Sequence, residues 1–243
     1  MYIKKSYYCG KVLEVEKIQT FRYKSKHTVR APQSNPTPEA QAVVNERNSI
    51  KNLARLMNTN FKHGDWHLSL TYARENRASS PQEAKADLAK FLRNVKLASK
   101  RRGLSFYYIA VSEYGERSMH HHVVMHCELP LEEVQAIWSH GRIGISVLDN
   151  KGDYTQLAKY LVKQTRKTYN DPERRVHAKR YCQSKNLRKP LVKIEKVTAD
   201  SWREMPTAPR GYYVLPDSIV QNVSDITGYP YQYYKCLLLN TDT

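Results

Sequence analysis

The chain has 243 residues and carries 40 Lys and Arg against 23 Asp and Glu, which gives a formal net charge of +17 at neutral pH. This length suits one sizeable domain with or without appendages, and the positive charge indicates a polyanionic partner. No stretch approaches the roughly 18 consecutive apolar residues of a membrane span, the basic N-terminus lacks the apolar core of a secretory signal, and the four cysteines form no CxxC pair. We therefore expect a cytoplasmic protein with no membrane contact, zinc knuckle or disulfide framework.

The first part of the chain reads as an appendage to a larger domain. A basic and aromatic stretch leads into a proline-punctuated loop at residues 31–38, and an apolar period typical of a helix follows at residues 39–57. We expect residues 1–58 to form a basic appendage whose helix docks on the main domain. That domain is expected to span residues 59–200, and residues 201–243 form a tail that the sequence leaves unassigned.

Residues 66–72 alternate strictly between apolar and polar side chains, which predicts a strand with one face toward a core. The polar face carries His67, Ser69 and Thr71.

A strong helix start follows this strand. Ser80 supplies an N-cap residue, Pro81 occupies the first helical position and Glu83 completes a capping box; the helix is expected to end near Arg101, before Gly103. Two paired strands, a short helix, a strand, a second capped helix and a last strand are predicted at residues 105–113 and 119–127, 130–138, 143–148, 153–167 and 191–196. Helices combined with a mostly antiparallel central sheet define an α+β fold.

Three of the nine histidines are consecutive and lie in the second strand of the predicted pair. Because alternate side chains of a strand share a face, His120 and His122 point the same way and His121 the opposite way. Two imidazoles on one face can converge on a metal ion, and Glu113 on the neighbouring strand can supply a carboxylate, which leaves coordination positions open for substrate. The other interpretation is a chance cluster of polar residues at a sheet edge. His126 shares the parity of the pair and is either a supporting group or unrelated.

Tyr160 lies on the second capped helix, where Leu157, Leu161 and Val162 form the apolar stripe. A phenol attacks a phosphodiester only when its proton is removed or its charge is stabilised, and Lys163, one helical turn later, is well placed to stabilise it. The structural interpretation is a surface tyrosine that packs on the sheet.

Together these pieces resemble the HUH endonuclease superfamily, and within it the single-tyrosine rolling-circle replication initiators of bacterial phages, plasmids and integrative elements. The resemblance covers roughly residues 62–196. Four segments carry it, in the family's order: WHLSLTY at 66–72, HHHVV at 120–124, YLVK at 160–163 and RYCQSKNLRKP at 180–190. It implies an HUH-type sheet of ferredoxin-like or RRM-like form, flanked by helices.

The resemblance also implies a chemistry. Glu113, His120 and His122 would hold Mg²⁺ or Mn²⁺ against the scissile phosphate, and Tyr160 would attack it to leave a 5′-phosphotyrosine and a free 3′-OH. Tyr154 is the alternative nucleophile. The polar residues of the first strand would support the metal site, contact the DNA strand or serve structure alone.

One departure from the family's pattern stands at position 121, where members usually have a bulky apolar residue and this chain has His121. The chain also has no GxxxxGK[ST] motif, so no nucleotide cofactor and no fused helicase are expected. The implied partners are single-stranded or hairpin DNA at a replication origin in a bacterial host, together with a host DNA polymerase and helicase.

A basic stretch between residues 163 and 193 follows the candidate nucleophile. Tyr169 and Tyr181 lie within it, and this mixture favours a single-strand contact surface in which cations neutralise phosphates and aromatic rings stack on bases. The residues predicted to bind DNA are Lys167, Arg174, Arg175, Lys179, Arg180, Lys185 and Arg188.

Three other functions remain open from the sequence. A different HUH enzyme, such as a relaxase or a single-strand transposase, would use a similar site for another task. A non-catalytic nucleic-acid-binding α+β domain would keep the basic surface without the chemistry. An iron oxygenase with two histidines and one carboxylate is disfavoured by the high positive charge.

Overall fold

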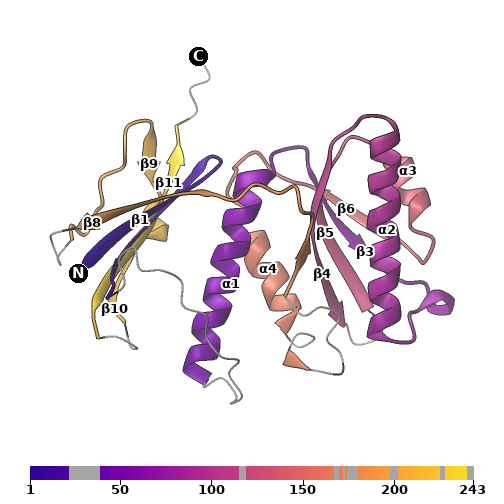
Figure 1. Cartoon of the computed structure of the whole chain (residues 1–243), viewed down its shortest axis with the longest axis horizontal. Helices are drawn as coiled ribbons and strands as arrows, with labels where there is room; N and C mark the ends of the chain where they lie inside the picture. The colour runs from indigo at the N-terminus through magenta and orange to yellow at the C-terminus, as the bar shows by residue number, and fades with distance from the viewer. Residues whose placement is uncertain are drawn as a thin grey trace. The chain divides into compact units, whose positions relative to one another are not determined.

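The computed structural model describes residues 1–21, 39–114, 119–166, 170, 171, 173, 180–197, 202–224 and 228–239 (Figure 1). The chain divides into two compact units: a terminal unit, which combines Met1–Asn45 with Lys189–Thr243, and a central unit, Glu46–Arg188. Each unit is built around its own sheet, and every strand pair in the described part of the chain is antiparallel. With four helices flanking these sheets, the fold is α+β, as the sequence predicts.

The terminal unit contains a six-stranded sheet in the order β10-β11-β2-β1-β8, with β9 paired to β11. Its strands are β1 (Tyr2–Cys9), β2 (Val12–Gln19), β8 (Leu191–Val197), β9 (Tyr212–Val214), β10 (Val220–Val223) and β11 (Pro230–Leu238). The short turn of the β1–β2 hairpin places Gly10 at a φ of 59°, a left-handed conformation that glycine adopts at little cost. A small apolar core forms around Leu13, Val15, Tyr234 and Cys236.

This division differs from the boundaries at residues 58 and 200 that the sequence suggested. The strand expected at residues 191–196 is present as β8, but it pairs with β1 in the terminal unit and does not join the histidine strand. The unassigned tail supplies strands β9, β10 and β11 to the same sheet. Hydrophobic patterning identifies a strand without identifying its partner, so pairing between distant segments was not predictable from one sequence.

The central unit contains a five-stranded sheet in the order β6-β3-β5-β4-β7. Its strands are β3 (Trp66–Leu70), β4 (Phe106–Tyr114), β5 (Met119–Cys127), β6 (Ile143–Val147) and β7 (Cys182–Gln183). The helices are α1 (Glu39–Asn60), α2 (Pro81–Arg101), α3 (Leu131–Ile137) and α4 (Thr155–Gln164), and short 3₁₀ turns occur at Arg74–Asn76 and Pro216–Ser218.

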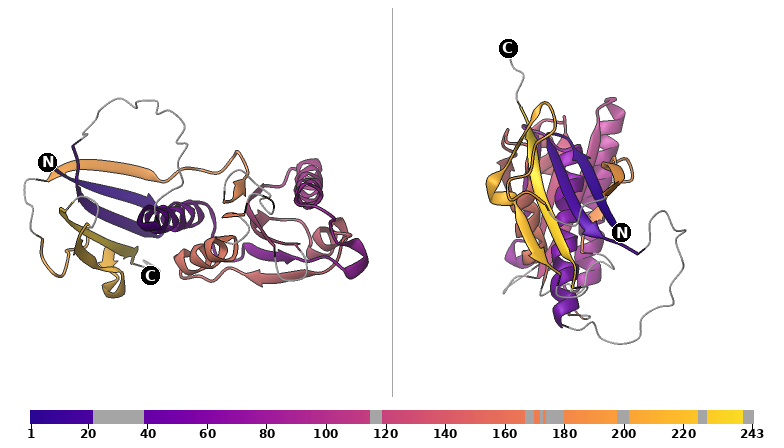
Figure 2. Two further views of the ribbon diagram at one scale, coloured as in Figure 1. Left: turned by 90° about the horizontal axis from the view of Figure 1, so that it is seen from below. Right: turned by 90° about the vertical axis from the view of Figure 1, so that its left-hand side faces the viewer.

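Two hydrophobic cores sandwich the central sheet. On one face α2 and α3 pack through Leu88, Phe91 and Val134, and on the other α1 and α4 pack through Leu53 and Leu161. Figure 2 shows the same arrangement, with α2 and α3 on one side of this sheet and α4 on the other. Both faces are therefore covered at the middle of the sheet, and polar side chains have room only toward its ends and edge.

Helix α2 begins as its sequence predicts. The hydroxyl of Ser80 accepts a hydrogen bond from the Glu83 amide at 3.2 Å, and Pro81 occupies the first turn. The Glu83 carboxylate accepts from the Ser79 amide at 2.6 Å, so the reciprocal bond of the capping box goes to one residue earlier than the motif implies. Gly103 ends the helix with a φ of 69°.

None of the helices in the described ranges has the length and apolar character needed to cross a membrane. The four cysteines are all free, in line with the expected lack of a disulfide framework.

Candidate active site

A cluster of polar side chains gathers on the face of the central sheet that packs against α1 and α4. The register places Glu113 of β4 opposite His120 of β5, and Ser69 of β3 opposite His122. His67 lies two residues before Ser69 on β3 and therefore shares its face. We refer to these five residues as the site cluster, and the strand alternation predicted from the sequence accounts for their common face.

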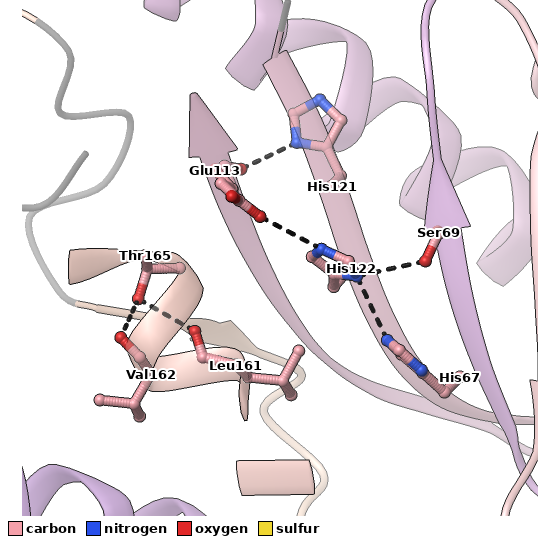
Figure 3. Close-up of polar contacts among 9 residues, drawn as sticks. His67, Ser69, Glu113, His121, His122, Leu161, Val162 and Thr165 are labelled. Carbon is pink, nitrogen blue, oxygen red and sulfur yellow. Dashed lines mark hydrogen bonds and ion pairs between the residues drawn. The ribbon is translucent and has the colours of Figure 1, made fainter. Parts of the chain in front are cut away.

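His122 is the centre of the cluster (Figure 3). Its Nε2 lies 3.5 Å from an Oε of Glu113, and its Nδ1 lies 3.2 Å from the Ser69 hydroxyl and 3.3 Å from Nε2 of His67. The imidazole is almost fully buried, with 8% of the side chain exposed. Side chains from three adjacent strands thus converge on one ring.

His67 stacks on His122 with ring centroids 5.4 Å apart, and its other nitrogen, Nδ1, lies 3.3 Å from the hydroxyl of Ser146 on β6. Burial and, after it, the neighbouring His122 lower the pKa of His67 to about 4. Burial also lowers the pKa of His120, against the opposing effect of Glu113. At neutral pH these two imidazoles are uncharged, the form in which histidine binds metal ions.

The donor chemistry of the site cluster fits a divalent metal ion. Neutral imidazoles suit transition metals, and a carboxylate suits Mg²⁺ and Mn²⁺ as well. Within the described ranges, however, no three His, Cys, Asp or Glu side chains already stand together as a metal cage. Glu113 and His122 are in contact and His120 lies directly opposite Glu113, so the assignment of these three as ligands remains a prediction.

His121 points to the opposite face, as the strand alternation predicts. It is fully buried, with Nε2 3.0 Å from the Tyr72 hydroxyl and Nδ1 2.8 Å from the Ser112 hydroxyl. It therefore takes no part in the site cluster by direct contact.

Tyr160 on α4 lies beside the two stacked histidines. Its ring centroid is 5.6 Å from that of His122 and 6.4 Å from that of His67, and both contacts are edge-on. The side chain is 42% exposed, so a substrate can reach the hydroxyl. Lys163, one turn later, is exposed.

The helix that carries Tyr160 is held from its other side. Leu161 and Val162 are buried in the core, and the Thr165 hydroxyl donates to the carbonyl groups of both at the helix end (Figure 3). The expected extension of this helix to Lys167 lies outside the described residues. A helix fixed by its apolar stripe presents Tyr160 in a defined position.

Tyr154, the alternative nucleophile, is buried before the first turn of α4. Its hydroxyl donates to the carbonyl of Asp149 at 3.1 Å, and burial raises the pKa of its phenol to about 12. This placement indicates a structural role.

Two other polar residues considered from the sequence do not contact the cluster. Thr71 lies beyond the end of β3, where its hydroxyl donates to the carbonyl of Arg142 at 3.1 Å. His126 lies farther along β5, with Nδ1 2.7 Å from Asp65 and its ring stacked on Tyr107. Ser146 is a cluster neighbour that the sequence did not single out, because its link to His67 depends on the pairing of β3 with β6.

The predicted DNA-binding residues fall into two groups. Lys185 and Arg188 are not buried, whereas the side chain of Arg180 is only 13% exposed, and its guanidinium lies 3.8 Å from the Glu46 carboxylate. Lys167, Arg174, Arg175 and Lys179 lie outside the described residues. The placement of Arg180 favours a structural contact between its segment and α1.

The segment after Arg180 is attached to β4 and α1. The Ser184 hydroxyl accepts from the Tyr108 amide at 3.1 Å, and the Asn186 side chain donates to the Phe106 carbonyl at 3.0 Å. The Asn60 side chain bonds both backbone groups of Arg188 at 2.8 Å. Several polar residues of this stretch therefore fix the backbone in place.

Residues 65–165 match a family model of replication-associated proteins, the ORF2 type. The matched segment covers less than half of the chain. It begins one residue before β3 and ends one residue after α4, so it contains the whole site cluster and Tyr160. No curated protein and no solved structure matches the chain. The family match is consistent with a replication initiator.

Proposed function

We propose that this protein nicks and rejoins single-stranded DNA at a replication origin, with Tyr160 as the nucleophile, and so starts rolling-circle replication. The observation that carries the proposal is the position of Tyr160, whose exposed ring lies beside His122 while His122 contacts Glu113. The match to replication-associated proteins supports DNA as the substrate, and so does the net charge of +17.

In the proposed reaction the Tyr160 oxygen attacks the scissile phosphorus and the bond from phosphorus to the 3′ oxygen breaks. The phenol loses its proton, the leaving oxygen gains one, and the 5′ phosphate stays on the tyrosine. Lys163 stabilises the developing phenolate by charge. The free 3′-OH primes synthesis, and its return attack on the phosphotyrosine rejoins the strand.

A divalent ion held by Glu113, His120 and His122 would polarise the phosphate oxygen and lower the barrier to attack. His67 and Ser69 orient the His122 ring through their contacts with Nδ1. Tyr160 enters from α4 and the ligands come from β4 and β5, so the nucleophile and the phosphate-binding groups are supplied by separate rigid elements.

The test is a covalent-adduct assay on the full chain. Labelled single-stranded oligonucleotides tiled from the replicon that encodes the protein are mixed with it in Mn²⁺ or EDTA and separated on denaturing gels. We expect an Mn²⁺-dependent adduct with wild type and none with Tyr160→Phe. Tyr154→Phe is the matched control, because it removes one phenol hydroxyl from the start of the same helix, and it should form the adduct.

An adduct that survives in Tyr160→Phe but is lost in Tyr154→Phe would assign the nucleophile to Tyr154. Binding of the oligonucleotides without any adduct would favour a non-catalytic DNA-binding domain.

A further inference from the structure

Behind the site cluster, on the opposite face of the central sheet, four polar side chains form a continuous hydrogen-bonded chain. The Tyr72 hydroxyl donates to the Asp87 carboxylate at 3.1 Å and lies 3.0 Å from Nε2 of His121. Nδ1 of His121 lies 2.8 Å from the Ser112 hydroxyl. We refer to Asp87, Tyr72, His121 and Ser112 as the rear chain. It connects α2, the segment after β3, β5 and β4.

The order of donors along the rear chain follows from the chemistry of its ends. A carboxylate only accepts, so the Tyr72 hydroxyl gives its proton to Asp87 and its oxygen accepts from His121. A neutral imidazole carries one N–H, which is then on Nε2, and Nδ1 accepts from the Ser112 hydroxyl. Burial, and next the Asp87 charge, raise the pKa of Tyr72, so its hydroxyl keeps the proton that it donates.

Each middle member of the rear chain adjoins a residue of the site cluster. Ser112 directly precedes Glu113 on β4, and His121 lies between His120 and His122 on β5. Ser112 and His121 also face each other in the strand register, as Glu113 and His120 do. A bond between the rear side chains therefore fixes the same two backbone segments that carry the cluster on the front.

Aromatic rings enclose the imidazole of His121. Its centroid lies 5.8 Å from Tyr72 and 6.0 Å from Trp138, whose rings are 5.3 Å from each other, and all three contacts are edge-on. His121 has no exposed surface. An apolar side chain would fill this position without needing partners, so a fully bonded histidine here adds orientation to simple packing.

We propose that the rear chain is a positioning device for the site cluster: by tying β4 to β5 behind Glu113, His120 and His122, it sets the angle at which these side chains approach a bound metal ion. The inference rests on the metal site of the proposed function. It assigns a role to His121 that the apolar residue usual at this place in the resembling family would not perform.

The test compares Mn²⁺ affinity in three full-length variants without DNA. Tyr72→Phe and Ser112→Ala each break one bond of the rear chain while leaving the site cluster untouched. Tyr154→Phe is the control, because it removes a buried phenol hydroxyl from the same unit, and that hydroxyl bonds the Asp149 carbonyl rather than β4 or β5. Mn²⁺ binding is followed by the paramagnetic signal of the free ion, and the melting temperature is recorded in EDTA.

We expect Tyr72→Phe and Ser112→Ala to weaken Mn²⁺ binding about ten-fold, the lower end of the effect seen when groups behind a metal ligand are removed. Tyr154→Phe should keep the wild-type affinity even where its melting temperature falls as far. Equal affinity in all three variants would overturn the positioning role while leaving the proposed function intact. Wild-type protein that binds no Mn²⁺ would overturn the metal site itself, and this inference with it.

A spectroscopic measurement tests the donor order directly. Long-range ¹H–¹⁵N correlation spectra of the histidine side chains should show His121 protonated on Nε2 and unprotonated on Nδ1. Tyr72→Phe should change the His121 signals, whereas Tyr154→Phe should not. A proton on Nδ1 in the wild type would contradict the chain of donors.

Discussion

His67 and His122 lie face to face, with an angle of 24° between their rings and with Nε2 of one 3.3 Å from Nδ1 of the other. The two rings come from neighbouring strands, and the Tyr160 ring meets both at its edge. His67 is therefore the side chain that links the proposed ligand to the proposed nucleophile.

Replacing His67 should impair catalysis without abolishing DNA binding. In His67→Ala, His122 loses one of its contacts and Tyr160 loses a neighbour, so we expect the rate of adduct formation to fall about 10- to 100-fold. His67→Gln should recover part of that loss, because the amide can again reach Nδ1. Single-turnover rates and oligonucleotide affinity measured in parallel check this. A fall in affinity as large as the fall in rate would show that His67 binds the strand.

Arg180 and Lys185 should respond differently to substitution, although both belong to the basic stretch. Because Arg180 is mostly buried against Glu46, Arg180→Ala should lower the free energy of unfolding by about 1–3 kcal/mol, between the values for exposed and buried ion pairs. Lys185→Ala should leave stability unchanged and reduce the salt dependence of DNA binding by about one phosphate contact.

Urea unfolding curves and binding isotherms at several salt concentrations separate these two effects. Unchanged stability in Arg180→Ala, together with a reduced salt dependence, would return Arg180 to the DNA interface.

The N-cap of α2 offers a test of stability apart from function. Ser80→Ala removes the hydroxyl that accepts from Glu83, so the free energy of unfolding should fall by about 1 kcal/mol. Ser80→Asp should restore it, because aspartate is also a good N-cap residue. Adduct formation under conditions where all variants are folded should not change, since α2 packs on the face away from the site cluster.

The buried Tyr154 should make the protein sensitive to alkali. Its folded pKa is raised to about 12 while an unfolded tyrosine titrates near about 10, so its stabilising effect is present in full below about pH 10 and is lost as the pH rises toward 12. Tyr154→Phe should flatten this part of the stability curve. Melting temperatures from about pH 8 to 11 measure it. Equal slopes in the two proteins would contradict the assignment.

Local patterns in the sequence were enough to predict the elements of the site. The alternation in residues 66–70 and 119–127 correctly put His67, Ser69, His120 and His122 on one face and His121 on the other. The capped starts of α2 and α4 are also local features, and both helices form within two residues of the expected positions.

Features that depend on tertiary pairing were not predictable. Thr71 follows the alternation of β3, yet β3 ends at Leu70 and the Thr71 side chain turns to Arg142. Arg180 looks like any other cation in a basic run, because nothing local reveals that Glu46 lies beside it. The sheet of the terminal unit combines strands from both ends of the chain, and no periodicity carries that information.

That sheet also has a consequence for synthesis. The β1–β2 hairpin leaves the ribosome first, but its neighbours β8 and β11 follow only after the whole central unit has been made. At about 5–20 residues per second the hairpin waits on the order of ten seconds with both edges unpaired. The central unit is continuous in sequence and can fold during that interval, so the nascent chain acquires its proposed catalytic centre before its two ends join.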